Sequence, residues 1–307
     1  MADDSPQISP NANQTSAEGQ RRRFWQRAHE TVSVIQPWSV MVAAIALTLS
    51  AIQFSMDLNE RSRARAVQAW QVVATPGPGN SGKTTALEYL NKSGAPLVGI
   101  DLSRPVSERG DACLTRQHQG VFLRDVDLQD AYLVGSNLTA ADLQAADFRG
   151  AMLIEANLSH ASLYLADLRR AHLHKAKLAG ANLQRAKLDR AILLDATLTG
   201  ACLSNARLVD ALLARAAMSK ANLSLADLSR ASMHGADLSG SILVDSNLQS
   251  ADLTGSDLTG AVMTGTKIRG TTLRASRGLT QAMLDEACGD EATSLPIGLT
   301  TPPCPPE

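Results

Sequence analysis

Between residues 121 and 275 the hydrophobic positions recur every five residues. A large apolar residue stands at position 123 and at every fifth position to 273, which gives 31 consecutive positions without an insertion, and 26 of them are Leu. A small residue stands two places before each of these central residues, and it is Ala in 23 cases. A period of five matches neither the 3.6-residue helix nor the two-residue strand. We therefore expect a chain that turns one corner in every repeat.

Four such corners close a square coil of twenty residues. Backbone groups then pair with the coils above and below at about 4.8 Å, so roughly eight coils give a rod about 37 Å long. A bundle of Leu-rich helices is excluded because a period of five precesses around a helix and leaves no apolar stripe. Glycines two places after a central residue are expected to take a positive φ at the corners: Gly150, Gly180, Gly200, Gly240 and Gly260. The pattern predicts an all-β solenoid.

The repeats resemble a known family. Ala181-Asn182-Leu183 and Ala251-Asp252-Leu253 show the motif Ala-Asp/Asn-Leu-x-x, which is similar to that of the pentapeptide-repeat proteins over residues 121–275. The resemblance implies a right-handed quadrilateral β-helix. Some members of the family resemble B-form DNA and inhibit DNA gyrase, but here 16 Lys and Arg stand against 15 Asp and Glu in this segment. A mimic of a polyanion should be strongly acidic, so a topoisomerase-interacting DNA mimic is kept as an alternative only.

The segments beside the repeats should close the two ends of the solenoid. Residues 97–102 read as a first short strand, which extends the β-helix to 97–275, after a helical linker and N-terminal cap over 57–96. A capping helix is expected over 276–290, with Thr280 as its N-cap and Gly289 at its end. The tail over 291–307 is rich in Pro and should be extended or loose.

A segment near the N-terminus suggests a membrane anchor. Residues 31–56 carry no charge, and 38–56 are long enough to span about 28 Å as a helix, close to the ~30 Å hydrocarbon layer. We therefore expect a transmembrane helix over 31–56 behind a disordered basic tail over 1–30. The protein would then be a single-pass protein of the inner membrane of a bacterial cell.

Two features leave the membrane prediction open in detail. Arginines flank the segment almost equally on both sides, so a periplasmic solenoid is only slightly favoured. Polar residues also dilute its hydrophobicity, so a buried or interfacial helix is the alternative: Ser39, Thr48, Ser50, Gln53 and Ser55.

Residues 77–84 match the P-loop pattern G-x-x-x-x-G-K-S/T. In a P-loop, Lys83 would reach the β- and γ-phosphates and Thr84 would hold Mg²⁺. Such a loop needs a parallel sheet around it, and the neighbouring sequence supplies none. We read the segment as a Gly/Pro linker in which Asn80 or Ser81 caps a following helix. A nucleotide-binding switch through 77–84 is kept as an alternative.

The remaining chemistry of the sequence is sparse. The cysteines Cys113, Cys202, Cys288 and Cys304 lack metal-type spacing, and both separate thiols and a Cys288–Cys304 disulfide remain open. The repeats contain no Ser-His-Asp grouping and no paired carboxylates, so we expect no catalytic residue, no cofactor and no metal site. The formal net charge of -1 gives no reason to expect nucleic acid.

One outer face of the predicted solenoid is unusually apolar. Residues twenty apart should stack, which places a candidate partner face beside the central residues Leu133 to Leu213: Tyr132, Val134, Met152, Ile154, His172, Ile192, Leu194 and Leu212. His172 and His174 share this face without carboxylates, so metal binding is not expected. Exposed apolar patches over several coils usually mark interfaces. We expect a scaffold or docking surface for an unknown protein or a second copy, unless the chain's own linker or terminal segment covers it.

Overall fold

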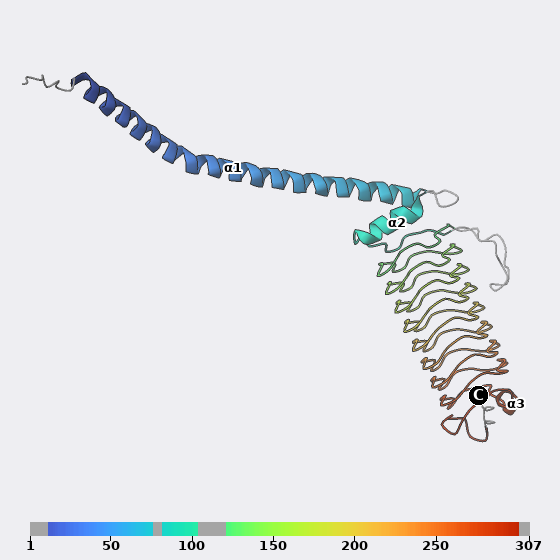
Figure 1. Cartoon of the computed structure of the whole chain (residues 1–307). Coiled ribbons are helices and arrows are strands. Elements are labelled where there is room, and N and C mark those ends of the chain that lie inside the picture. The colour runs from blue at the N-terminus through green and yellow to red at the C-terminus, as the bar shows by residue number, and fades with distance from the viewer. Residues whose placement is uncertain (1–11, 76–81, 104–120, 301–307) are drawn as a thin grey trace, which may run out of the picture. The chain divides into compact units, whose positions relative to one another are not determined.

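The computed structural model describes residues 12–75, 82–103 and 121–300, without the side chains of 12–21, 24–40, 42 and 43. The chain divides into two compact units, Met1–Arg65 and Ala66–Glu307, which are described separately. Its helices are α1 (Ala12–Ala74), α2 (Lys83–Lys92) and α3 (Gln281–Asp285). The solenoid in Figure 1 consists of stacked coils joined by single-residue β-bridges.

The first unit differs from the prediction for the N-terminal region. α1 begins at Ala12, so much of the segment 1–30, predicted as a disordered tail, is helical, while residues 1–11 lie outside the description. Across the described ranges, none of the helices combines the length and the apolar character needed to cross a membrane. The transmembrane helix over 31–56 and the inner-membrane localisation are therefore wrong. The five polar side chains between Ser39 and Ser55 interrupt the apolar run.

The second unit contains the predicted square coil. The residue before each central residue pairs in parallel with the residue twenty positions ahead, from Phe122↔Asp142 to Asp257↔Arg277. Every central residue from Leu123 to Leu273 is at most 1% exposed. The interior is therefore a continuous column of Leu and Ala, as the five-residue period predicts.

The repeat motif follows from the backbone hydrogen bonds of one coil. In the repeat Asp147–Ala151, four of the five backbone N–H groups donate to backbone carbonyls at 2.8 to 3.0 Å. The fifth, at Arg149, donates to Oδ1 of Asp147 at 3.1 Å. Asn157 accepts from the N–H of Ser159 in the same way. Where Asp or Asn stands before the central residue, its side chain therefore accepts from the one N–H group of the repeat that does not donate to a backbone carbonyl.

The corners require a left-handed backbone whatever residue stands there. The five glycines expected at corners have φ between 62° and 70°, which confirms that prediction. Twenty-one other residues hold the same position with φ between 54° and 60°, although this conformation costs a non-glycine residue about 1 kcal/mol. Beyond the corners, glycine is also needed at Gly278, where a Cβ would clash with the backbone of Thr259.

The C-terminal part of α1 and α2 close the N-terminal end of the solenoid. Leu87 and Leu90 of α2 are fully buried and join Ala69 and Val73 of α1 in the core. The strand predicted over 97–102 is a single bridge, Asp101↔Asn137. These partners are 36 residues apart where the regular coil needs 20, so 16 residues are inserted between them. Residues 104–120, which lie between Asp101 and Asn137, are outside the description.

The C-terminal end is closed by a shorter helix than predicted. Thr280 is the N-cap of α3, as expected, and its Oγ1 accepts from the N–H of Met283 at 3.3 Å. The capping helix predicted over 276–290 is reduced to the five residues of α3 because the chain then returns to the coil. Cys288 pairs with Lys267, and Ser294 pairs with Thr272, so the start of the predicted loose tail 291–307 extends the solenoid.

The described cysteines are not separate thiols. Cys202 and Cys288 are each disulfide-bonded. The other two cysteines, Cys113 and Cys304, lie outside the described residues, and so does the predicted Cys288–Cys304 pairing.

Candidate functional site

The eight residues of the predicted partner face lie together on one side of the solenoid. Five of them form a single ladder of bridges in the order Tyr132, Met152, His172, Ile192 and Leu212. Val134, Ile154 and Leu194 stand two positions further along the same repeats, beyond the buried central residue. Tyr132 is 52% exposed and Leu212 is 41% exposed, and the other six are partly exposed. We call these eight residues the apolar stripe.

Corner residues border the apolar stripe and carry alternating charge on one edge. Along that edge the order is Glu155, Lys175, Asp195 and Arg215. Two nitrogens of Arg215 donate to Asp195 at 2.7 Å each. The hydrogen bond from Arg215 lowers the pKa of Asp195, so this carboxyl stays charged well below neutral pH.

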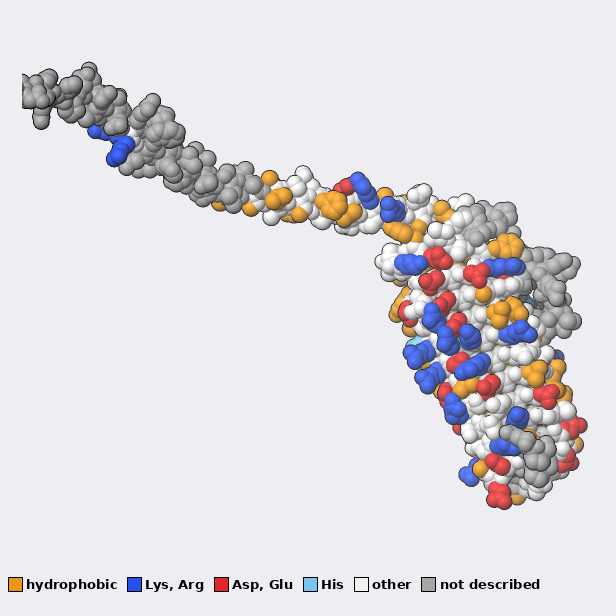
Figure 2. All heavy atoms as spheres, in the orientation of Figure 1, with side chains coloured by type: hydrophobic (Ala, Val, Ile, Leu, Met, Phe, Trp, Pro, Cys, Tyr) orange, Lys and Arg blue, Asp and Glu red, His pale blue; other side chains and the backbone are white. Residues whose placement is uncertain are grey.

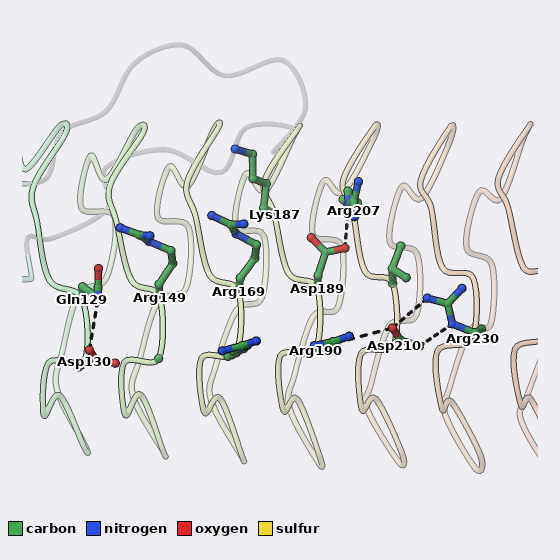
Figure 3. Close-up of a pocket in the computed structure, with 13 residues that line it drawn as sticks. Gln129, Asp130, Arg149, Arg169, Lys187, Asp189, Arg190, Arg207, Asp210 and Arg230 are labelled. Carbon is green, nitrogen blue, oxygen red and sulfur yellow. Dashed lines mark hydrogen bonds and ion pairs between the residues drawn. The ribbon is translucent and has the colours of Figure 1, made fainter.

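The neighbouring face carries a groove lined by arginines, which sequence reasoning missed. Figure 2 shows Lys and Arg side chains gathered on this side of the solenoid, and Figure 3 shows them in two rows along its axis. The groove has a volume of about 880 Å³. We call it the arginine groove, and its lining residues are Gln129, Asp130, Arg149, Gly150, Arg169, Arg170, Lys187, Asp189, Arg190, Arg207, Val209, Asp210 and Arg230.

Four of the arginines in the groove are held by carboxylates. Arg207 Nε lies 2.7 Å from Asp189, and Arg230 Nε lies 2.7 Å from Asp210 (Figure 3). Arg149 and Arg169 each bind the aspartate two residues earlier in the sequence, Asp147 and Asp167. These carboxylates therefore fix the guanidinium groups along the groove.

The pKa values of two of these carboxyls follow from the same contacts. The hydrogen bond from Arg149 lowers the pKa of Asp147. Burial raises the pKa of Asp167, but the hydrogen bonds from Arg169 outweigh burial and the net shift is downward. Both carboxylates thus remain charged, and both ion pairs remain intact, well into the acidic range.

Three cations of the groove have weaker partners or none. Arg190 lies 3.9 Å from Asp210, which Arg230 already binds more closely. Among the described residues, no carboxylate lies within ion-pair distance of the side chains of Arg170 and Lys187. Positive charge is therefore in excess here, and this face does not have the acidic surface that a DNA mimic requires.

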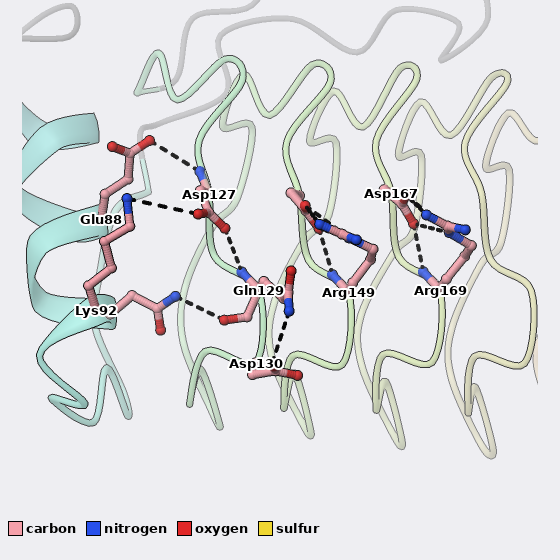
Figure 4. A network of polar contacts seen from close by, with 10 residues as sticks. Glu88, Lys92, Asp127, Gln129, Asp130, Arg149, Asp167 and Arg169 are labelled. Atoms are coloured by element: carbon pink, nitrogen blue, oxygen red, sulfur yellow. Dashed lines mark hydrogen bonds and ion pairs between the residues drawn. The ribbon is translucent and has the colours of Figure 1, made fainter.

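The groove begins where α2 meets the first coil. Figure 4 shows Glu88 and Lys92 of α2 beside Asp127. Glu88 Oε1 accepts from the N–H of Asp127 at 3.2 Å, and Asn91 Nδ2 donates to the carbonyl of Gln129 at 3.0 Å. The same helix that buries Leu87 thus fixes the start of the charged face.

Comparison with known proteins agrees with the repeat geometry. The family model described as Pentapeptide repeats (8 copies) matches residues 123–159, 131–170, 166–205, 206–245 and 241–277. Together these ranges cover half of the chain. The chain belongs to the pentapeptide-repeat family. No curated protein matches this pentapeptide-repeat protein.

Several solved structures are similar to this pentapeptide-repeat protein. HetL, a pentapeptide repeat protein involved in heterocyst differentiation regulation in the cyanobacterium Nostoc sp. strain PCC 7120, is 29% identical; the match covers 59% of this chain and 93% of HetL, with a TM-score of 0.29. QnrB1, a plasmid-mediated fluoroquinolone resistance protein, is 16% identical over 64% of this chain and 90% of its own, with a TM-score of 0.36. Rfr23 from the cyanobacterium Cyanothece 51142 is 29% identical over 40% and 63%, with a TM-score of 0.21.

The P-loop-like segment of this pentapeptide-repeat protein ends at the start of α2. Lys83 is the first residue of α2, and it is only 4% exposed. The helix that follows packs on the end of the solenoid rather than on the parallel sheet that a P-loop needs. Residues 77–81, including the expected caps Asn80 and Ser81, lie outside the description.

The two histidines of the apolar stripe's face, His172 and His174, are partly exposed. His174 Nδ1 lies 3.1 Å from the carbonyl oxygen of Leu194 and 3.9 Å from Asp195. Among the residues that the structure describes, no three His, Cys, Asp or Glu side chains are placed to hold a metal ion.

Proposed function

We propose that this pentapeptide-repeat protein is a non-enzymatic docking scaffold, and that its apolar stripe binds a second copy of the chain. The observation that carries the proposal is the ladder from Tyr132 to Leu212, in which five successive coils present an apolar or aromatic side chain, or His172, at the same outward position. Such patches on soluble surfaces usually mark interfaces.

The coil beneath the stripe favours binding without rearrangement. Each central residue behind the stripe is fully buried, for example Leu173 and Leu193. The backbone of each coil is hydrogen-bonded to the coils on both sides. A surface that is already ordered loses little conformational entropy when a partner docks.

The alternating charges beside the stripe support a second copy as the partner. If two copies pack with their solenoids antiparallel about a two-fold axis, Glu155 faces Arg215 and Lys175 faces Asp195, so opposite charges meet. In the same arrangement Met152 faces Leu212 and His172 faces Ile192. The other edge would bring Arg170 and Arg190 together, so the contact is centred towards the alternating edge. Closed two-fold contacts of this kind are the commonest in oligomers.

Light scattering of the full chain tests this proposal. We expect the mass of a dimer that dissociates on dilution, and a monomer for the variant Ile192→Asp with Leu212→Asp. Ile242→Asp with Val262→Asp is the matched control, because these residues take the same repeat position in adjacent coils of another face and are 39% and 43% exposed. A wild-type monomer at every concentration, or equal loss of the dimer in both variants, would contradict the proposal.

A further inference from the structure

We propose that the arginine groove binds an extended acidic segment of another polypeptide. Seven cationic side chains line the groove, against three aspartates. The proposal does not rest on the dimer, because the groove occupies the face next to the apolar stripe, although the corner residues that line it, such as Arg170 and Arg190, border that stripe.

The free charge of the groove lies in its middle coils. Arg170 and Lys187 lie between the paired arginines at either end, and neither has a carboxylate at ion-pair distance among the described residues. Asp189 and Asp210 are already bound at 2.7 Å by Arg207 and Arg230. A ligand that brings its own carboxylates can therefore pair with these cations without displacing an existing ion pair.

The shape of the groove suits an extended chain. Its lining runs from Asp130 to Arg230, which are five coils apart, or about 24 Å at the spacing of paired strands. An extended polypeptide covers this length with about seven residues. Guanidinium groups match the planar geometry of a carboxylate and bind it through two hydrogen bonds. The rows of arginine along the groove therefore favour a ligand with a run of Asp or Glu.

Two features of the lining favour an acidic polypeptide over a nucleic acid. Proteins that bind single strands place aromatic side chains beneath the bases, and none of the thirteen lining residues is aromatic. Asp130, Asp189 and Asp210 also lie in the groove, where they would repel a continuous phosphate backbone. A peptide can place its carboxylates beside the free cations and neutral groups beside these aspartates.

Fluorescence anisotropy with a labelled octa-glutamate peptide and the full chain tests the inference. The variant Arg170→Gln with Lys187→Gln removes the two cations that have no carboxylate at ion-pair distance among the described residues, and it leaves the ion pairs of Arg149, Arg169, Arg207 and Arg230 intact. Lys220→Gln with Lys177→Gln is the matched control, since Lys220 is a corner residue like Arg170 and Lys177 is a bridge residue like Lys187. Neither control residue lines the groove. Circular dichroism shows whether both variants keep the wild-type fold.

We expect the groove variant to bind the peptide about five- to tenfold more weakly than the wild type, and the control to bind as the wild type does. The binding should also weaken as salt rises from 0.1 M to 1 M, because the screening length falls from about 10 Å to about 3 Å. Equal losses in both variants, or no binding of the peptide by the wild type in low salt, would overturn the inference. Tighter binding of an oligothymidylate than of the peptide would show that the ligand is a nucleic acid instead.

Discussion

The face with the apolar stripe and the neighbouring face with the arginine groove share one interior, but their outer side chains differ in chemistry. Behind both, the central residues are buried and alternate with buried small residues, as at Ala166, Leu168, Ala171 and Leu173. Outside, one face presents a ladder from Tyr132 to Leu212 without Asp, Glu, Lys or Arg, and the other presents two rows of arginine and aspartate.

This difference separates two kinds of information in the repeats. The inward positions determine the fold, and they are nearly constant because each must fill the same space. The outward position before the central residue can vary without loss of the bridge between coils, since the same bridge occurs at Ile192 and at Lys187. Each face can therefore carry its own binding chemistry.

The interior should be the place where a single substitution affects both faces. Leu173 is fully buried behind the apolar stripe, and Leu173→Ala should lower the free energy of unfolding by about 3–5 kcal/mol through the cavity it leaves. Leu165→Ala, at a corner residue that is 47% exposed, should change it by less than about 0.5 kcal/mol. Urea unfolding measures both, and similar losses would show that the interior does not dominate stability.

A smaller effect should distinguish the charged face by its response to pH. The pKa values of Asp147 and Asp167 are lowered in the folded state from a reference of 3.8. The stabilisation is therefore fully present above pH 3.8 and is lost as pH falls through the lowered values. Asp147→Asn with Asp167→Asn should cost about 0.5 kcal/mol per pair at pH 7, and the difference from the wild type should shrink at pH 3.

This experiment has an internal reference. Asn keeps the side-chain oxygen that accepts the backbone N–H two residues ahead, as Asn157 does, so the substitutions remove only the charge. Asp237→Asn at the same repeat position is the control, because Asp237 has no ion pair among the described residues and the substitution should remove no ion-pair stabilisation at pH 7. An unfolding difference that is the same at pH 7 and pH 3 would disprove the role of the two ion pairs.

The sequence alone was sufficient to predict the structure of the repeats. The period of five predicted the inward column and the shared face of the apolar stripe, because stacking follows directly from a twenty-residue coil. The ends were less predictable. The pairing of Asp101 with Asn137 breaks the regular spacing, and no repeat in the sequence marks where the chain re-enters the coil. The apolar run at 31–56 has the length of a membrane span, but its polar residues make it less apolar than a span requires.

The arginine groove escaped prediction for a different reason. The net positive charge of the groove does not show in a count of charges along the chain. Arg169 and Arg170, for example, are followed within twenty residues by Asp189. The groove emerges only when the rows on both sides of a corner are combined and the paired arginines are separated from Arg170 and Lys187. Counting charges for each face, rather than for each segment, is the signal that could have revealed it.

The independence of the two faces is tested most directly by the affinity of the labelled octa-glutamate peptide for the variant Ile192→Asp with Leu212→Asp. This variant removes the apolar stripe's contact and replaces no residue that lines the groove or fills the interior. We expect its dissociation constant to stay within about twofold of the wild-type value, as for substitutions at separate sites. A loss of peptide binding together with the loss of the dimer would contradict the claim that one interior supports two separate docking faces.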